Sequence, residues 1–276
     1  RRHPLRPFTL PTSVAVVFIN DANTADALID QHLGDYSQAV SFDIEWSRNT
    51  PRKDKLHDMS IPNRDPNYQI PRLITIATPY VVLVIDMVAL GQVLPQGVKD
   101  ILTDGDIPKV GSNIIVDTTL VLRFYGLPVY NAVDLSHAYR VLHPYIESGP
   151  LTVGVEGIES LLRKLFRLLI DKGERRSNWA QPVLTRQQID YAAADAYAGI
   201  LIYGAVAPLL AASRSPHFTR STYSFNMALV VDGRILPEGA AASGRDIHAW
   251  GVNHDIKTNW EPSHAVLDGY GLPVYT

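Results

Sequence analysis

Hydrophobic and polar positions follow two periods along the chain, and each period predicts a type of element. Runs rich in β-branched residues predict strands at 14–19, 39–46, 73–77, 81–87, 107–111 and 132–135. Apolar residues at helical spacing predict helices at 25–33, 90–102, 113–124, 136–145, 158–169 and 185–212. Strands come first, helices gather later, and the two alternate in between. This order predicts an α/β domain with a mixed sheet.

The pattern changes after Ser213, where helical periodicity stops and Gly, Ser, Pro and His become frequent. We therefore divide the chain into a domain at 1–213 and an irregular C-terminal extension at 214–276. Within the extension, 228–236 predicts a β-hairpin with an Asp-Gly turn. A long polar and basic segment at 47–69 predicts a loop, which is either a phosphate-contacting element or an ordinary solvated insertion.

Composition narrows the classes of function. The 276 residues carry 25 Lys and Arg against 28 Asp and Glu, a net charge of -3, so nucleic acid would need a local basic surface or bound metal ions. Cysteine is absent, which excludes disulfides, thiolate zinc sites and thiol catalysis. No apolar run approaches the roughly 18 residues of a membrane span, and no signal peptide is visible, so we expect an intracellular protein without a membrane partner. The sequence does not indicate whether the protein resides in the nucleus, the cytoplasm or the mitochondrion.

Two acidic residues stand out in the strand predicted at 39–46. Asp43 and Glu45 lie two apart, and residues i and i+2 of a strand share a face. Like charges on one face of a segment built for burial repel each other, and a hard cation such as Mg²⁺ or Mn²⁺ would remove that cost. A solvated strand face explains the pair equally well.

Two predicted helices add further acids. Asp117 sits among apolar residues at 113–124, and on its own it is better explained by a solvent-facing position. Tyr191 and Asp195 are four apart in an Ala-rich run, which places both on one helix face. A Tyr hydroxyl one turn from a carboxylate could hold a water beside a metal, although Tyr191 alone is more typical of a core aromatic.

Together these pieces form three ordered motifs. They are Ser41-Phe42-Asp43-Ile44-Glu45-Trp46; Val110-Gly111-Ser112-Asn113-Ile114 through Asp117; and Ser177-Asn178-Trp179 with Tyr191-Ala192-Ala193-Ala194-Asp195. Their order and spacing resemble the DEDDy group of 3'–5' exonucleases, which includes ribonuclease D and the Werner syndrome exonuclease. The sequence is most similar to the Werner branch of this group, and the resemblance spans roughly residues 14–210.

The resemblance implies a fold, a reaction and roles for the acids. The fold is ribonuclease H-like, with a mixed five- to six-stranded sheet flanked by helices. The reaction removes nucleotides one at a time from a 3' end and releases 5'-monophosphates with two divalent ions, Mg²⁺ or Mn²⁺. By analogy Asp43, Glu45 and Asp195 hold one ion, Asp43 and Asp117 the second, and Tyr191 orients the attacking water.

Further residues are candidates for contact with substrate. Ile44 and Trp46 flank the first motif and could press against the terminal base, with core packing as the alternative. Asn113 lies at a predicted helix start, where capping explains it better than substrate contact. Arg175 and Arg176 belong to a basic cluster before the third motif, either as phosphate contacts or as a solvated face.

The resemblance implies that the protein binds nucleic acid, but it does not indicate which nucleic acid is the substrate. We expect a nucleic acid with a 3' end, RNA or DNA, and a candidate docking role for the extension 214–276 toward a protein partner. The competing hypothesis is a catalytically silent nucleic-acid or protein-binding module on the same fold. Such modules usually lose acidic ligands, and this sequence retains all of them.

Overall fold

A computed structural model describes residues 4–47, 70–146, 156–212 and 223–225, together with short strands at 229–231, 234–236, 266–267 and 273–274. Its strands are β1 (Arg6–Pro7), β2 (Ala15–Ile19), β3 (Val40–Ser47), β4 (Ile70–Ala77), β5 (Val81–Asp86), β6 (Lys109–Gly111), β7 (Ala132–Asp134), β8 (Leu168–Leu169), β9 (Ser224–Phe225), β10 (Leu229–Val231), β11 (Arg234–Leu236), β12 (Val266–Leu267) and β13 (Pro273–Val274). Its helices are α1 (Ala22–Leu33), α2 (Gln96–Thr103), α3 (Ile115–Tyr125), α4 (Leu135–Ile146), α5 (Ile158–Phe166), the 3₁₀ helix η1 (Gly173–Arg176) and α6 (Arg186–Ala212).

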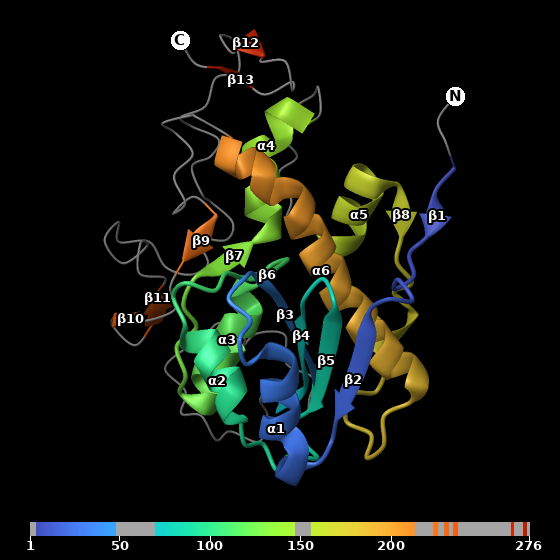
Figure 1. Cartoon of the computed structure of the whole chain (residues 1–276), viewed down its shortest axis with the longest axis vertical. Coiled ribbons are helices and arrows are strands. Elements are labelled where there is room, and N and C mark those ends of the chain that lie inside the picture. Colours follow the sequence, from blue (N-terminus) through green and yellow to red (C-terminus); the bar gives the residue numbers. More distant parts are fainter. Residues whose placement is uncertain are drawn as a thin grey trace.

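The central sheet has seven strands in the order β2-β5-β4-β3-β6-β7-β9 (Figure 1). Strand β4 is antiparallel to both β3 and β5, whereas β3, β6 and β7 run parallel to one another. The mixed sheet is confirmed, but the expected upper limit of six strands was wrong. The extra strand is β9, a two-residue piece of the C-terminal extension that pairs with β7. Two residues carry no periodicity from which a strand could be predicted.

Each face of the sheet has its own apolar core because neighbouring strand residues point to opposite sides. On β4 and β5, Ile74, Ile76 and Leu83 pack in the core formed with α1, α2 and α3. Leu73 and Val84 pack in the other core, with α4, α5 and α6. Helix α6 runs diagonally across this second face (Figure 1) and contacts β3, β4, β5 and β6.

Several predicted boundaries shift where the backbone takes a left-handed conformation. Helix α2 begins at Gln96 rather than near 90, because Gly91 and Gln92 both have positive φ and Pro95 precedes the first turn. Helix α5 ends at Phe166 rather than 169, because Arg167 has a φ of 58°. The chain then enters β8, which pairs in parallel with the unpredicted strand β1.

Helix α6 is long and apolar enough, by length and composition alone, to cross a membrane, contrary to our expectation that no such segment exists. Its hydropathy comes from many Ala residues together with larger apolar ones such as Ile200, Leu201 and Ile202. In the fold, Ala192, Ala193, Ala196 and Ile202 are buried against the sheet and neighbouring helices. These contacts are those of a core helix in a globular domain.

The hairpin predicted at 228–236 is confirmed, since β10 pairs antiparallel with β11 and Val231 lies opposite Arg234. Strands β12 and β13 form a second antiparallel pair. Ser47, the first residue of the predicted basic loop, is the last residue of β3, whereas the rest of that loop (48–69) and most of the extension 214–276 lie outside the described residues. The division of the chain at 213 stays a prediction.

Candidate active site

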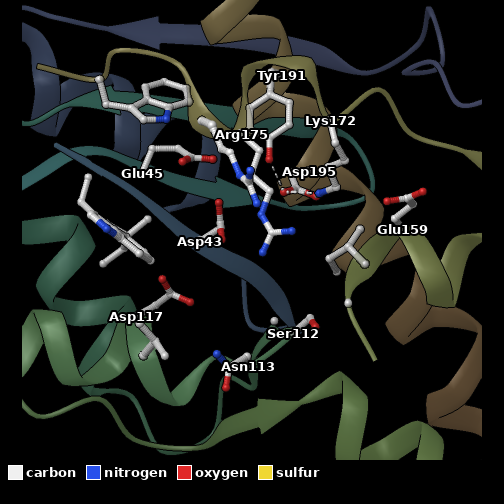
Figure 2. Close-up of a pocket in the computed structure, with 18 of the residues that line it drawn as sticks. Asp43, Glu45, Ser112, Asn113, Asp117, Glu159, Lys172, Arg175, Tyr191 and Asp195 are labelled. Carbon is white, nitrogen blue, oxygen red and sulfur yellow. Dashed lines mark hydrogen bonds and ion pairs between the residues drawn. The ribbon is translucent and has the colours of Figure 1, made fainter. Parts of the chain in front are cut away.

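A cavity of about 760 Å³ opens beside the middle of the sheet, between β3, the start of α3, the start of α5, η1 and α6. Every site residue predicted from the sequence lines it: Asp43, Ile44, Glu45, Trp46, Asn113, Asp117, Arg175, Arg176, Tyr191 and Asp195. Figure 2 shows how these elements surround one space. Residues from distant parts of the chain therefore meet in a single cavity.

Strand β3 supplies Asp43 and Glu45 on the face that α6 covers. Phe42 and Ile44 alternate with them and lie in the core on the α1–α3 side. The strand is thus anchored by its apolar residues on one face and presents both carboxylates on the other. A solvated strand face, the alternative for this pair, is excluded because both acids line the cavity and are only partly exposed.

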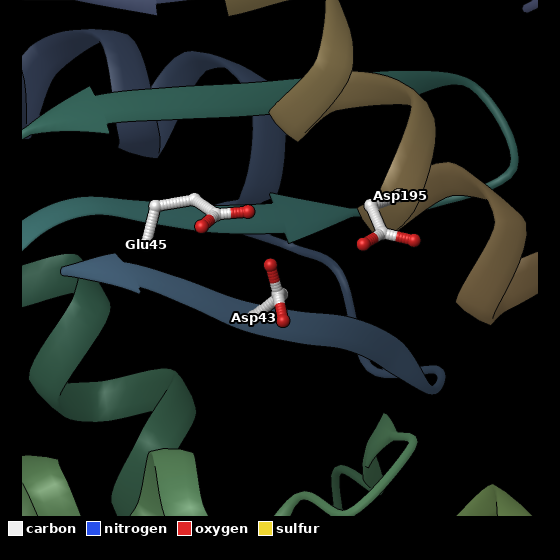
Figure 3. Close-up of side chains that lie close together, drawn as sticks. All are labelled: Asp43, Glu45 and Asp195. Atoms are coloured by element: carbon white, nitrogen blue, oxygen red, sulfur yellow. The ribbon is translucent and has the colours of Figure 1, made fainter. Parts of the chain in front are cut away.

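Helix α6 supplies Tyr191 and Asp195, one turn apart as predicted. The Tyr191 hydroxyl donates a hydrogen bond to Asp195 Oδ2 at 3.1 Å. One oxygen from each of Asp43, Glu45 and Asp195 lies within 4.8 Å of the others. Figure 3 shows the three side chains converging from β3 and α6. We call these three residues the acidic triplet.

Helix α3 places Asp117 on another side of the cavity (Figure 2). Asp117 is 5% exposed, so the solvent-facing position favoured by its local sequence was wrong. The carboxylate of Asp134 holds the turn before the helix. Its Oδ2 accepts a hydrogen bond from the Ile114 N–H, and its Oδ1 accepts hydrogen bonds from the N–H groups of Ser136 and His137. This single carboxylate links the start of α3 to the start of α4 and fixes where Asp117 enters the cavity.

Asn113 does not cap helix α3, in contrast to our expectation. The N-cap is Ile114, which makes no side-chain capping bond, and Asn113 precedes it with a φ of 58°. Asn is among the few residues other than Gly that tolerate this left-handed conformation. The side chain is exposed and lines the cavity, so the geometry favours the substrate-facing alternative.

The two apolar candidates differ in what they expose. Ile44 is 2% exposed and belongs to the core opposite the acids, which favours packing over contact with a base. Trp46 is partly exposed at the cavity wall, next to a register shift between Glu45 and Trp46. Its substrate contact stays a prediction.

Crowding of the acids raises their affinity for protons. Burial, and then the charge of Asp195, raises the pKa of Asp43 to about 7. Burial, and then the charge of Asp43, raises the pKa of Glu45 to about 10. The pKa of Asp117 is also well above its usual value, through burial and then Asp43. At neutral pH the acids therefore resist full ionisation unless positive charge lies among them.

Cations line the same cavity, and one of them was missed as a site residue. Lys172 Nζ lies 2.6 Å from Asp195 Oδ1 and 2.7 Å from Oδ2. Arg175 and Arg176 lie on η1 at the cavity wall. Lys172 was not singled out as a site residue from the sequence, because no local pattern reports a pairing across 23 residues.

The acidic residues fit a hard divalent cation. Carboxylate oxygens are the preferred ligands of Mg²⁺ and Mn²⁺, and three residues offer them within mutual reach. Their raised pKa values have a common origin in burial and repulsion, both of which a bound cation relieves. The donor set is therefore suited to a metal ion.

Comparisons with known proteins agree with this geometry. The chain is 35% identical over 115 residues to human Exonuclease 3'-5' domain-containing protein 2, covering 41% of this chain and 18% of that protein. It is 37% identical over 111 residues to mouse Bifunctional 3'-5' exonuclease/ATP-dependent helicase WRN, covering 40% and 8%. The match thus spans under a fifth of the length of either relative.

Solved structures share the fold. The Nibbler EXO domain of Aedes aegypti aligns with a TM-score of 0.56 at 22% identity, over 76% of this chain and 93% of that one. The RNase D of Trypanosoma brucei in complex with RNA U12 gives a TM-score of 0.56 at 16% identity, over 70% and 62%. These likenesses confirm the ribonuclease H-like fold that the resemblance implied.

A family model described as 3'-5' exonuclease matches residues 16–211, which extend from within β2 to within α6 and include every cavity residue named above. The match covers well over half of the chain. The chain therefore belongs to the 3'-5' exonuclease family.

Proposed function

We propose that this chain is a metal-dependent exonuclease that removes nucleotides from the 3' end of a nucleic acid and releases 5'-mononucleotides. The observation that carries the proposal is the acidic triplet, whose oxygens lie within 4.8 Å of one another in an open cavity. Family membership gives the class of reaction. A silent binding module would have no use for carboxylates held together at the cost that their raised pKa values record.

The proposal includes two divalent ions, Mg²⁺ or Mn²⁺. Asp43, Glu45 and Asp195 would hold one, and Asp43 with Asp117 would hold the other. When bound, such ions neutralise phosphate charge and make a water more acidic. They also explain how a chain of net charge -3 attracts a polyanion.

The other cavity residues receive roles in orienting the reactants. The Tyr191 hydroxyl lies beside Asp195 and would orient the water that attacks phosphorus. The bond from phosphorus to the 3' oxygen of the preceding nucleotide then breaks. Arg175 and Arg176 would contact backbone phosphates, and Trp46 and Asn113 the terminal nucleotide.

RNA and DNA are both compatible with this cavity. One structural relative holds RNA, whereas another sequence relative carries a helicase in its name. We propose a single-stranded 3' end as the substrate, because an unpaired terminal base is free to stack on Trp46 at the cavity wall. A panel of single- and double-stranded RNA and DNA, measured as initial rates at equal 3'-end concentration, separates these classes.

The first test follows direction and metal dependence together. An oligonucleotide labelled on its terminal 3' nucleotide is expected to release labelled mononucleotide when Mg²⁺ or Mn²⁺ is added, and none in excess chelator. The same oligonucleotide labelled at its 5' end should give a ladder of shortened products. Release of internal fragments, or equal rates on 3'-blocked and free ends, would contradict the proposal.

The affinity of the site for Mn²⁺ should depend on pH. Asp43 and Glu45, with pKa values raised to about 7 and about 10, hold protons that a metal ion must displace. We expect affinity to fall as pH decreases from 8 to 6, by about tenfold per pH unit for each proton displaced. Titration calorimetry in two buffers of different ionisation enthalpy measures both the affinity and the number of protons released. A pH-independent affinity would show that these carboxylates do not bind the ion.

A further inference from the structure

Lys172 occupies a position that the proposed reaction does not use. It is the residue before η1, and its ammonium group pairs with both oxygens of Asp195. The side chains are 21% and 13% exposed, so water screens the pair only in part. Nζ also lies 5.4 Å from the centre of the Tyr191 ring. Figure 2 shows Lys172 reaching Asp195 from the side of the cavity opposite Asp117.

The backbone that carries Lys172 is fixed by contacts outside the cavity. Strand β8 pairs with β1, the Phe8 N–H donates to the Leu169 carbonyl at 2.7 Å, and the Phe8 ring stacks on Tyr197. On the other side, the Arg175 N–H donates to the Lys172 carbonyl. These contacts fix the backbone of Lys172 beside α6. A change of partner therefore involves only its flexible side chain.

Asp195 is a member of the acidic triplet and the acceptor of Tyr191, so its two oxygens already serve Lys172 and Tyr191. A divalent ion bound by the triplet would share Asp195 with the Lys172 ammonium group, which lies less than 3 Å from the Asp195 carboxylate. Two cations that close on one carboxylate repel each other strongly in a partly buried site. The ion and Lys172 therefore compete for Asp195.

We propose that Lys172 is a built-in counter-cation of the acidic triplet, which offsets its negative charge and which a divalent ion displaces from Asp195. The inference rests on the proposed metal site. It assigns Lys172 a role in setting metal affinity: the ammonium group occupies Asp195 until an ion displaces it, and so limits how tightly the triplet binds that ion.

The test measures metal binding rather than turnover. Lys172→Met keeps the length of the side chain and removes its charge. Titration of Mn²⁺ by calorimetry is expected to show about tenfold tighter binding to this variant than to the parent, because one competing cation is gone. Lys172→Arg keeps a cation and should bind Mn²⁺ as the parent does. Circular dichroism of each variant confirms folding, and Lys172→Gln serves if the Met variant does not fold.

A matched control exists on the neighbouring helix. Lys164 is also paired with one carboxylate, Glu156, at 2.9 Å, and the two side chains are 19% and 11% exposed. It does not line the cavity. Lys164→Met should therefore leave the Mn²⁺ affinity unchanged, which separates competition at Asp195 from a general loss of positive charge.

The outcomes distinguish this inference from the proposed function. Tighter binding to Lys172→Met alone supports competition. Binding to the parent that is equal to or tighter than binding to Lys172→Met overturns the inference while leaving the metal site intact. Absence of Mn²⁺ binding in the parent and in every Lys172 variant overturns both.

Discussion

Asp43→Asn is expected to lower the rate of nucleotide release by at least about a thousandfold, the largest effect of any single substitution in this chain. Asp43 belongs to the triplet, and its charge raises the pKa values of both Glu45 and Asp117, so it lies close to the acids of both proposed ion sites. Removing its charge therefore weakens both proposed ion sites at once. Initial rates with saturating Mn²⁺ on a 3'-labelled oligonucleotide measure the loss.

The same substitution should not destabilise the fold. Burial and Asp195 raise the folded-state pKa of Asp43 to about 7 from its ordinary 3.8, so without metal its stabilising contribution is lost as pH rises from about 4 to about 7. Asn carries no charge and escapes this cost. In chelator at pH 8 we expect the free energy of unfolding of Asp43→Asn to equal that of the parent or to exceed it by up to about 2 kcal/mol. Denaturant titration of both proteins measures this difference.

The matched control is Asp190→Asn on the same helix as Asp195. Asp190 is exposed and pairs with Arg186 at 2.9 Å, outside the cavity. An exposed i, i+4 pair contributes about 0.5 kcal/mol at most, so activity and stability should both stay near those of the parent. An active Asp43→Asn enzyme, or an equal loss in Asp190→Asn, would refute the assignment of Asp43.

The acids were predictable because their signal is local. A spacing of two on a strand and of four on a helix fixes which side chains share a face, whatever the rest of the fold does. Asp43 with Glu45 and Tyr191 with Asp195 were therefore assigned as pairs from the sequence. Asp117 was assigned only through the resemblance, because its apolar neighbours give no sign that the helix start is aimed at a cavity.

The remaining features depend on pairings between distant residues. Nothing near Lys172 in the sequence indicates that it meets Asp195, and nothing near Asp134 indicates that it holds Ile114. The left-handed φ of Asn113 was missed for a different reason, since Asn is common both at helix caps and in this conformation. The two-residue strands β1 and β9 are too short for any period to register.

Gly199→Ala is expected to lower nucleotide release by about a hundredfold although Gly199 does not line the cavity. It lies one turn after Asp195, where α6 packs tightly against Ser41 of β3. A Cβ at this position would overlap Ser41 Oγ and lie 3.2 Å from Ser41 Cβ. Ser41 Oγ in turn donates to the Val110 carbonyl, so it has little room to move aside. The helix must shift instead, and Asp195 moves with it, away from Asp43 and Glu45.

Stability should fall as well, by about 1 to 2 kcal/mol, because overpacking outweighs the higher helix propensity of Ala. Thermal unfolding in chelator measures this part without the contribution of metal. Mn²⁺ titration measures the other part, since a displaced Asp195 should weaken the ion's affinity in proportion to the loss of activity.

Gly204→Ala, later on the same helix, separates crowding from propensity. Gly204 is exposed, and beyond the backbone of its own helix a Cβ at this position would meet nothing within 4 Å. The substitution should raise stability by up to about 1 kcal/mol and leave activity unchanged. Adding Ser41→Ala to Gly199→Ala removes the overlapping oxygen and should restore part of both losses. If Gly199→Ala were as active as the parent, the packing of α6 against Ser41 would not set the position of Asp195, because the helix would have accommodated a Cβ there without moving the carboxylate.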